Sequence, residues 1–402
     1  MILLLLPFFS EAHTWEFHAG GKVTFKQLLQ KADVGDTILV DGIIREGTIN
    51  VDRSICLIGR DGAGIDGEQM GEVLVITASD VTVQHLLIRG TRRSNMDDNA
   101  GIKAKECLRT TIRDCHLEGC FFAIYLSGSR DALIENNSII GAKVEEHELG
   151  NGIHLWKCSK ATIRGNTVRD HRDGIYFEFV TDSHIDRNVS VGNLRYGLHF
   201  MFSHRDAYQD NLFQNNGAGV AVMFSKEIVM RRNRFLSNRG GSSYGLLLKE
   251  INDGEITENS FVDNTTALLV DGCNRIHAER NSFQLNGWAL RLYANASACT
   301  FKGNMFQGNT FDLSTNGDLQ LNTIEGNYWD RYIGYDLDRD GLGDTPYRPV
   351  GFFPLLVERM PFAMVFSRSL FVTLLDHAER VVPSLSPEAL KDDHPLMRPP
   401  HG

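Results

Sequence analysis

Asparagine recurs at a nearly constant interval along most of this chain. The eight positions are Asn166, Asn188, Asn211, Asn233, Asn259, Asn281, Asn304 and Asn327. Successive members are separated by 22, 23, 22, 26, 22, 23 and 23 residues. A repeat of this length predicts a solenoid of stacked coils rather than a globular domain with one core. Equivalent residues of adjacent coils should then lie about 4.8 Å apart, the spacing of neighbouring strands.

The repeat unit is strand-like. Apolar residues alternate within it, as in the segment from Gly197 to Phe202 (GLHFMF), and a period of two is the signature of a strand. An aromatic residue follows two positions after each of the last six asparagines: Phe213, Phe235, Phe261, Phe283, Phe306 and Trp329. We therefore predict an all-β fold, a right-handed parallel β-helix with three short strands per coil. The asparagines should hydrogen-bond along the stack at a tight corner, and the aromatic residues should stack inside.

The composition fits a long exported solenoid. The chain has 402 residues with 38 Gly and 10 Pro, and 42% of its residues are hydrophobic. A net charge of −10 argues against a nucleic-acid partner. No stretch reaches the roughly 18 apolar residues that a membrane-spanning helix needs. The seven cysteines form no CxxC pair, and we expect buried packing residues, with a disulfide possible but not required.

The chain divides into four segments. We expect a signal peptide over 1–12, a β-helix with an N-terminal cap over 13–329, an acidic calcium-type loop over 330–350, and a mostly helical C-terminal tail over 351–402. A buried strand is the alternative for the first segment. The cap should include a short helix over 24–32, and insertions are expected at 90–99, 142–150 and 239–243. The tail either caps the last coil or docks on a partner protein.

A soft-ligand cluster is expected on the outside of one sheet. When the coils are aligned on the Gly or Ala that begins one strand, the second and fourth following positions should face outward. This alignment places Met201 beside Met223 in adjacent coils, with His199 two residues from Met201. Two thioethers and an imidazole favour Cu(I) over hard cations. The alternative is a protein-contact patch, because methionine suits adaptable surfaces. His154, two coils away, and His204, at the edge of the same coil, are weaker candidates.

The acidic loop is a separate candidate. Asp336, Asp338, Asp340 and Asp344 stand at positions 1, 3, 5 and 9 of an EF-hand-like numbering, with Gly at position 6. Carboxylates at this spacing suit Ca²⁺. Position 12 is Tyr347 instead of the bidentate Glu, so an ordinary turn without metal remains the alternative.

A carbohydrate-active enzyme, such as a polysaccharide lyase or epimerase, is the rival function. Lys103, Lys105 and Glu106 beside Asp97 and Asp98 offer acids and bases near one groove. Glycoside hydrolysis needs two facing carboxylates about 5 to 9.5 Å apart, and the outward columns supply no such pair. We therefore expect no enzymatic activity.

Several motifs resemble one family closely. These are YGLHFMFS at 196–203, NYWD at 327–330, GYDLDRDGLGDTPY at 334–347 and LLDHAER at 374–380. They are similar to the NosD family, periplasmic β-helix proteins of nitrous oxide reductase maturation. The resemblance implies a periplasmic location, an ABC transporter made with NosF and NosY, and the copper chaperone NosL as a partner. It also implies work on the copper centres of nitrous oxide reductase, and docking of the tail on NosY.

Overall fold

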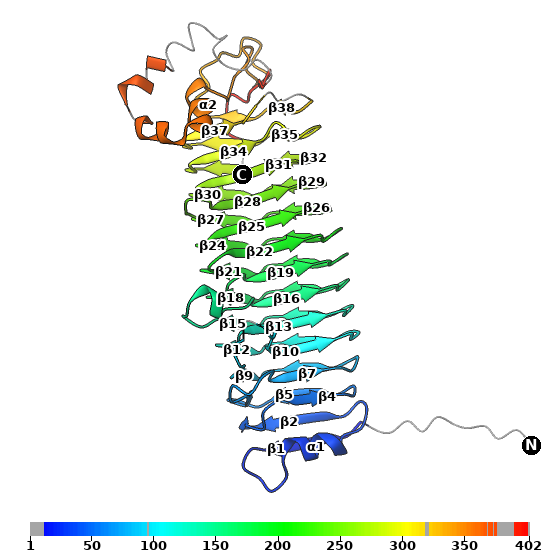
Figure 1. Cartoon of the computed structure of the whole chain (residues 1–402). Coiled ribbons are helices and arrows are strands. Elements are labelled where there is room, and N and C mark those ends of the chain that lie inside the picture. Colours follow the sequence, from blue (N-terminus) through cyan, green and yellow to red (C-terminus); the bar gives the residue numbers. More distant parts are fainter. Residues whose placement is uncertain are drawn as a thin grey trace, which may run out of the picture.

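The computed structural model describes residues 12–94, 96–317, 321–367, 369–372, 374–375 and 390–400. These residues form a long parallel β-helix, confirming the predicted fold class (Figure 1). Three parallel sheets run the length of the solenoid, with 14, 12 and 13 strands, and each coil contributes one strand to each sheet. Nearly all of the expected signal peptide lies outside the described residues.

The first sheet, called sheet A, has its strands in chain order. They are β1 (Thr14–His18), β2 (Thr37–Asp41), β5 (Cys56–Gly59), β8 (Thr82–Gln84), β11 (Thr111–Arg113), β14 (Leu133–Glu135), β17 (Thr162–Arg164), β20 (His184–Asp186), β23 (Ala207–Gln209), β26 (Lys226–Arg231), β29 (Asn252–Thr257), β32 (Asn274–Glu279), β35 (Thr300–Lys302) and β38 (Thr323–Glu325).

Sheets B and C are built in the same way. Sheet B contains β3 (Ile43–Ile44), β6 (Gly64–Asp66), β9 (Leu87–Arg89), β12 (His116–Glu118), β15 (Ser138–Ile140), β18 (Thr167–Arg169), β21 (Val189–Val191), β24 (Leu212–Gln214), β27 (Arg234–Leu236), β30 (Ser260–Val262), β33 (Ser282–Gln284), β36 (Met305–Gln307) and β39 (Tyr328–Trp329). Sheet C contains β4 (Ile49–Val51), β7 (Leu74–Ile76), β10 (Ala100–Lys105), β13 (Phe122–Ser127), β16 (Ile153–Trp156), β19 (Ile175–Glu178), β22 (Tyr196–Met201), β25 (Ala218–Met223), β28 (Tyr244–Lys249), β31 (Thr266–Asp271), β34 (Trp288–Leu292) and β37 (Phe311–Ser314).

The asparagine ladder forms as predicted at the corner between sheets A and B. Asn259 is typical: its backbone N and its Nδ2 both donate to Asn281 Oδ1, at 2.9 and 3.0 Å. The same Nδ2 also donates to the backbone oxygen of Met230 at 2.9 Å. Each buried amide is thus satisfied by the coils on either side, which fixes the stacking register. A second ladder, including Asn264 and Asn286, repeats this pattern at the next corner.

The predicted aromatic column stacks inside the solenoid. The rings of Phe235 and Phe261 lie 4.5 Å apart and nearly parallel, and the stack continues to Trp329, whose ring lies 4.1 Å from that of Phe306. All four rings are buried. The seven cysteines are free thiols, and six of them are buried. The thiols of Cys107, Cys158 and Cys273 donate to main-chain oxygens, as expected of packing residues.

The N-terminal end is closed by helix α1 (Phe25–Lys31). Thr24 and Gln27 form a reciprocal capping box at its start, and Phe25, Leu28 and Leu29 are buried. The expected cap helix is therefore confirmed. Sequence reasoning missed strand β1, which precedes the helix and pairs with β2, so the solenoid begins before the cap rather than after it.

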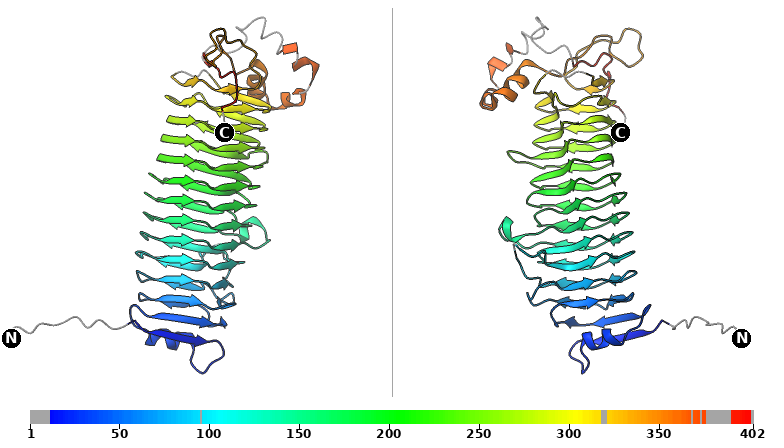
Figure 2. Two further views of the ribbon diagram at one scale, coloured as in Figure 1. Left: turned by 180° about the vertical axis from the view of Figure 1, so that it is seen from behind. Right: turned by 45° about the vertical axis from the view of Figure 1, so that its right-hand side comes forward.

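The C-terminal end is covered by a short helical segment and a returning strand-like segment. Helix α2 (Phe352–Arg359) and the 3-10 helix η2 (Pro361–Phe366) pack beside the last strands of sheet C. Arg291 of β34 forms an ion pair with Glu358 at 2.6 Å. Both views in Figure 2 show this segment projecting to the same side as the 142–150 insertion. Among the described residues, no helix has the length and apolarity needed to span a bilayer.

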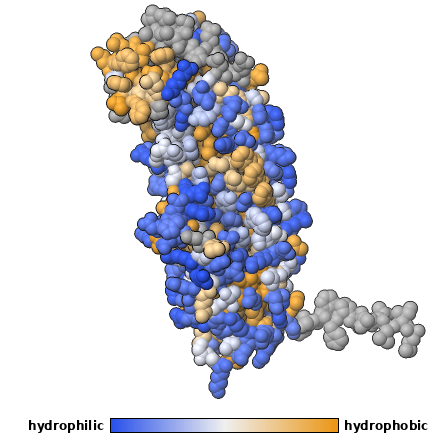
Figure 3. Space-filling model, viewed as in Figure 1, coloured by the Kyte–Doolittle hydropathy of each residue, from blue (hydrophilic) through white to orange (hydrophobic). Residues whose placement is uncertain are grey.

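The tail leaves a large apolar surface uncovered. Figure 3 shows hydrophobic atoms gathered at this end of the molecule. The exposed residues are Met360, Phe362, Val365, Phe366, Leu370, Phe371 and Leu374. An exposed patch of this kind on an otherwise polar surface is typical of a contact site for a protein or a membrane.

Candidate metal site on the outer face of sheet C

The predicted methionine pair lies on the outer face of sheet C. Strands β22 and β25 are hydrogen-bonded neighbours, and their register places Met201 opposite Met223 and His199 opposite Ala221. Both thioether side chains are half-buried. Paired positions of adjacent strands are about 5 Å apart, so the two thioether side chains start from neighbouring points on the same face of the sheet.

His199 is more enclosed than an outward side chain was expected to be. Only 6% of its surface is exposed, because two tyrosines flank it. The ring of Tyr196 lies 4.6 Å away and that of Tyr176 lies 5.0 Å away, measured between centroids. Neither ring nitrogen has a hydrogen-bond partner. Few buried polar groups lack a partner, so His199 stays a candidate ligand.

Sequence reasoning missed a buried carboxylate beside this imidazole. Asp173 lies in the turn before β19, and its Oδ2 is 3.8 Å from His199 Nδ1. The carboxylate is almost fully buried, and Oδ2 has no hydrogen-bond partner. Its position in the turn matches no repeat motif, so nothing in the coil alignment singles it out.

The weaker ligand candidates lie apart from the methionine pair. His154 is stacked between Tyr125 and Tyr176, with ring centroids 4.6 and 4.7 Å away. Tyr176 therefore separates it from His199. Burial lowers the pKa of His154 to about 3, so its ring is neutral. His204 lies past the corner between sheets C and A, where its backbone forms isolated β-bridges with Thr181 and Lys226 of the two adjacent coils. Burial, together with Lys226, lowers the pKa of His204.

An exposed aromatic stack borders the methionine pair. Phe179, Phe202 and Phe224 each follow a residue of the outward column, at the same turn position in three successive coils. Their rings stack at 5.4 and 5.1 Å, and Phe179 and Phe202 are exposed. All three adopt a positive φ of 50 to 54°, a conformation that costs about 1–2 kcal/mol for a residue with a Cβ. The same turn position has a positive φ in other coils, as in Lys157 and Glu250, so it is the exposed aromatic surface that favours a contact with a partner.

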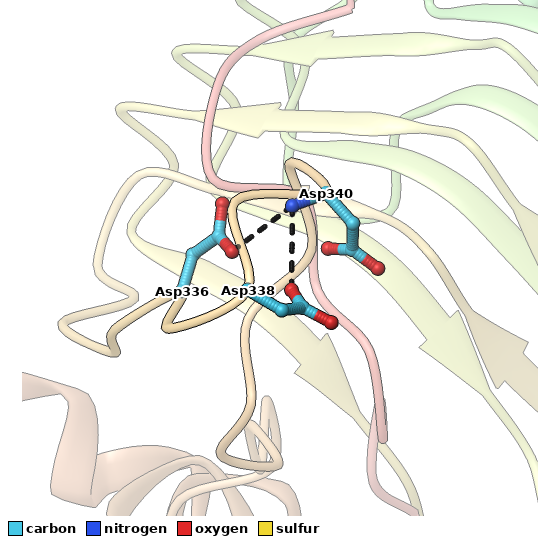
Figure 4. Close-up of side chains that lie close together, drawn as sticks. All are labelled: Asp336, Asp338 and Asp340. Carbon is cyan, nitrogen blue, oxygen red and sulfur yellow. Dashed lines mark hydrogen bonds between the residues drawn. The ribbon is translucent and has the colours of Figure 1, made fainter.

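The acidic loop brings three of its four predicted residues together. One carboxylate oxygen from each of Asp336, Asp338 and Asp340 lies within 4.8 Å of the others. Figure 4 shows the backbone N of Asp340 donating to Asp336 and Asp338, at 3.2 and 3.3 Å. Asp344 lies outside this group, and its Oδ2 accepts from the backbone N of Leu337 at 2.7 Å. Both oxygens of Asp336 accept from backbone N–H groups of the loop, as in an ordinary turn, while carboxylate oxygens are also the donors that a hard cation prefers.

The residues considered for the rival enzyme are engaged in structural contacts. Lys103 Nζ pairs with Glu72 Oε1 at 2.6 Å and donates to the backbone oxygen of Asp98 at 2.8 Å. Lys105 approaches the same Glu72 oxygen at 3.8 Å, and Asp97 accepts from the Ser94 hydroxyl. Lys103 also lies over the Tyr125 ring. Through its bond to Asp98 it anchors the 90–99 insertion to the solenoid.

Comparisons with known proteins identify the family of this chain. A family model described as "Periplasmic copper-binding protein (NosD)" matches residues 140–334, which include His199, Met201 and Met223. A "Probable ABC transporter binding protein NosD" of Pseudomonas aeruginosa is 31% identical over 375 residues, covering 88% of this chain and 86% of that protein. A protein of the same description from Stutzerimonas stutzeri is 29% identical over 385 residues, covering 88% and 85%.

Solved structures with the same fold are more distant in sequence. The family 28 exopolygalacturonase of Yersinia enterocolitica superposes with a TM-score of 0.60 at 7% identity, covering 78% of each chain. The catalytic unit of an α-1,3-glucanase from Streptomyces thermodiastaticus gives a TM-score of 0.53 at 14% identity, covering 77% of this chain and 67% of that one. At such identity these likenesses establish the β-helix and nothing about activity.

Proposed function

This chain belongs to the NosD family of periplasmic copper-binding proteins, and on that premise we propose that it receives Cu(I) from a chaperone. It acts in the periplasm as a non-enzymatic accessory of an ABC transporter and helps to assemble the copper centres of nitrous oxide reductase. NosL is the proposed donor, and NosF with NosY forms the proposed transporter.

The observation that carries this proposal is the pairing of Met201 with Met223 next to His199. All three ligands are neutral and two are soft, a set that favours Cu(I). The thioethers are half-buried and reach the surface, whereas the imidazole is covered. A site open on one side suits transfer between proteins better than storage.

Two apolar surfaces support contacts with partner proteins. The phenylalanine stack borders the methionine pair, where a copper donor must approach. The exposed tail surface around Phe362 and Val365 is apolar. We assign the membrane-embedded transporter subunit to it as the partner. Separate surfaces would let both partners bind at once.

A calcium ion held by Asp336, Asp338 and Asp340 is part of the same proposal. It would order the exit from the last coil, because the loop follows directly after Trp329. Without a bidentate Glu at the twelfth position, weak binding is expected.

The test is a Cu(I) titration against a competing chelator, bathocuproine disulfonate. The double change Met201→Leu and Met223→Leu removes both sulfur atoms with little change in volume. We expect the affinity to fall at least about tenfold. The matched control is Met70→Leu with Met305→Leu, because both residues lie away from the site. Equal affinity in the parent and the site variant would refute copper binding here.

A further inference from the structure

The carboxylate of Asp173 is held rigidly beside His199. Its Oδ1 accepts from the backbone N of Tyr196 at 3.3 Å and lies 3.8 Å from Arg195 Nε. Oδ2 faces His199 Nδ1, and only 1% of the side chain is exposed. The Arg195 guanidinium partly offsets the cost of burying this charge, and Oδ2 is left facing the imidazole without a hydrogen-bond partner among the described residues.

A neighbouring coil offers an internal comparison. Asn151 and Asp173 occupy equivalent positions, because Ile153 pairs with Ile175 in adjacent strands. Asn151 Nδ2 lies 3.0 Å from His154 Nδ1. An amide NH₂ can only donate, so Nδ1 of His154 accepts and its proton sits on Nε2. A carboxylate can only accept, so Asp173 favours the opposite tautomer in His199, with the proton on Nδ1.

The two histidines of this column, His154 and His199, therefore favour different tautomers. His154 keeps no lone pair at Nε2 and serves as a stacking ring between two tyrosines. His199 keeps its Nε2 lone pair free, and that atom is the one able to bind a metal. Asn151 faces the histidine of its own coil and Asp173 faces that of the next coil. The neighbouring group, an amide that donates or a carboxylate that accepts, favours one tautomer in each histidine.

We propose that Asp173 is a positioning residue of the copper site, which orients His199 with Nε2 free and supplies the negative charge that balances Cu(I). This inference rests on the proposed function. Thioether and imidazole ligands bring no negative charge to a metal ion, so a carboxylate behind the imidazole lowers the cost of placing Cu(I) in a half-buried site. A carboxylate behind a metal-binding histidine fixes its tautomer, and its loss typically lowers metal affinity about 10–100-fold.

The tautomer is measured first, in the metal-free protein. Histidine labelled with ¹⁵N is observed by NMR at about pH 8, where a free imidazole is neutral, with His199→Gln used to assign the signal. We expect the Nδ1–H form for His199 and the Nε2–H form for His154. Finding Nε2–H for His199 would overturn the proposal.

Copper affinity is measured next in Asp173→Asn, which keeps the shape of the side chain. We expect a loss of about 10–100-fold and a shift of His199 toward the other tautomer. The control Glu178→Gln removes a carboxylate next to Met201 and should leave the tautomer unchanged. Far-UV circular dichroism and the melting temperature check that each variant is folded.

The outcomes separate the two hypotheses. If the methionine double variant loses copper but Asp173→Asn binds as the parent does, Asp173 has no role and the copper site stands. If both variants bind copper as the parent does, the copper site itself is refuted, and the role of Asp173 in it falls as well.

Discussion

Asp392 Oδ2 accepts a hydrogen bond from Trp329 Nε1 at 3.0 Å, across 63 residues of sequence. The same oxygen accepts from the backbone N and the Nδ2 of Asn327, at 2.8 and 3.2 Å. Those are the two bonds that each ladder asparagine makes to the next one. Asp392 thus takes the place of a further asparagine and ends the ladder, while Trp329 ends the aromatic stack beside it.

Replacing Asp392 by Ala should destabilise the C-terminal coils. The change leaves the donors of Gly326, Asn327 and Trp329 buried and unpaired. Each such group costs about 1–3 kcal/mol, so we expect a loss of about 3 kcal/mol or more. Urea unfolding measures it. Asp393→Ala is the control, because that residue is half-exposed and, among the described residues, forms an ion pair with Lys391; an equal loss in both variants would contradict the capping role.

The ladders and the strand register could be predicted because they repeat. In a stacked solenoid the spacing in sequence fixes the neighbour in space, so Asn259 must meet Asn281 and Met201 must meet Met223. Asp392 could not be predicted in this way, since it returns from a non-repeating tail. The acidic loop was predicted from local spacing alone, and Asp344 turned instead to the backbone of Leu337.

The repeat pattern also did not predict that His199 of the proposed copper site is enclosed by neighbouring side chains. Alternation told which side of the sheet His199 faces, but not what covers that side. Tyr196 and Tyr176 flank the imidazole from strands β22 and β19, and Asp173 approaches it from the turn before β19. The residue types at these positions change from coil to coil, so the repeat does not predict how tightly they enclose His199.

A second prediction concerns acid sensitivity. His171 is fully buried at the base of the second ladder, where its backbone N donates to Asn193 Oδ1 at 3.1 Å. Burial lowers the pKa of His171 to about 4. The unfolded chain has an ordinary histidine pKa of about 6.5, so it binds the proton first, and stability falls as the pH drops from about 6.5 to 4. The contribution is at most about 3 kcal/mol.

His171→Asn should remove this part of the acid sensitivity. An asparagine there can donate Nδ2 to Asn193 Oδ1, as every later ladder member does, and so extends the ladder by one coil. Melting temperatures of parent and variant between about pH 7 and 4 test this. His147→Asn, in the 142–150 insertion, is the control. Parallel curves for parent and His171→Asn would show that the buried imidazole does not contribute.

A third prediction concerns calcium. Adding Ca²⁺ should raise the melting temperature, because a ligand that binds only the folded state stabilises it, and a chelator should reverse the effect. Asp338→Ala should abolish the response, whereas Asp61→Ala, in a distant turn, should preserve it. An unchanged melting temperature in the parent on adding and removing calcium would mark the loop as an ordinary turn.

The last prediction separates docking from folding at the phenylalanine stack. Phe202→Asn replaces a strained exposed ring by a residue that tolerates positive φ. Stacking with Phe179 and Phe224 is lost, at about 0.5–1.5 kcal/mol for each pair, but about 1–2 kcal/mol of backbone strain is relieved. The free energy of unfolding should therefore change little, while binding of the proposed copper donor NosL, measured by calorimetry, should weaken. Lys157→Asn is the matched control, since it occupies the same turn position with a φ of 52° one coil before Phe179 and carries no aromatic ring. If Phe202→Asn lowers stability and leaves donor binding intact, the stack only supports the solenoid and the donor approaches elsewhere.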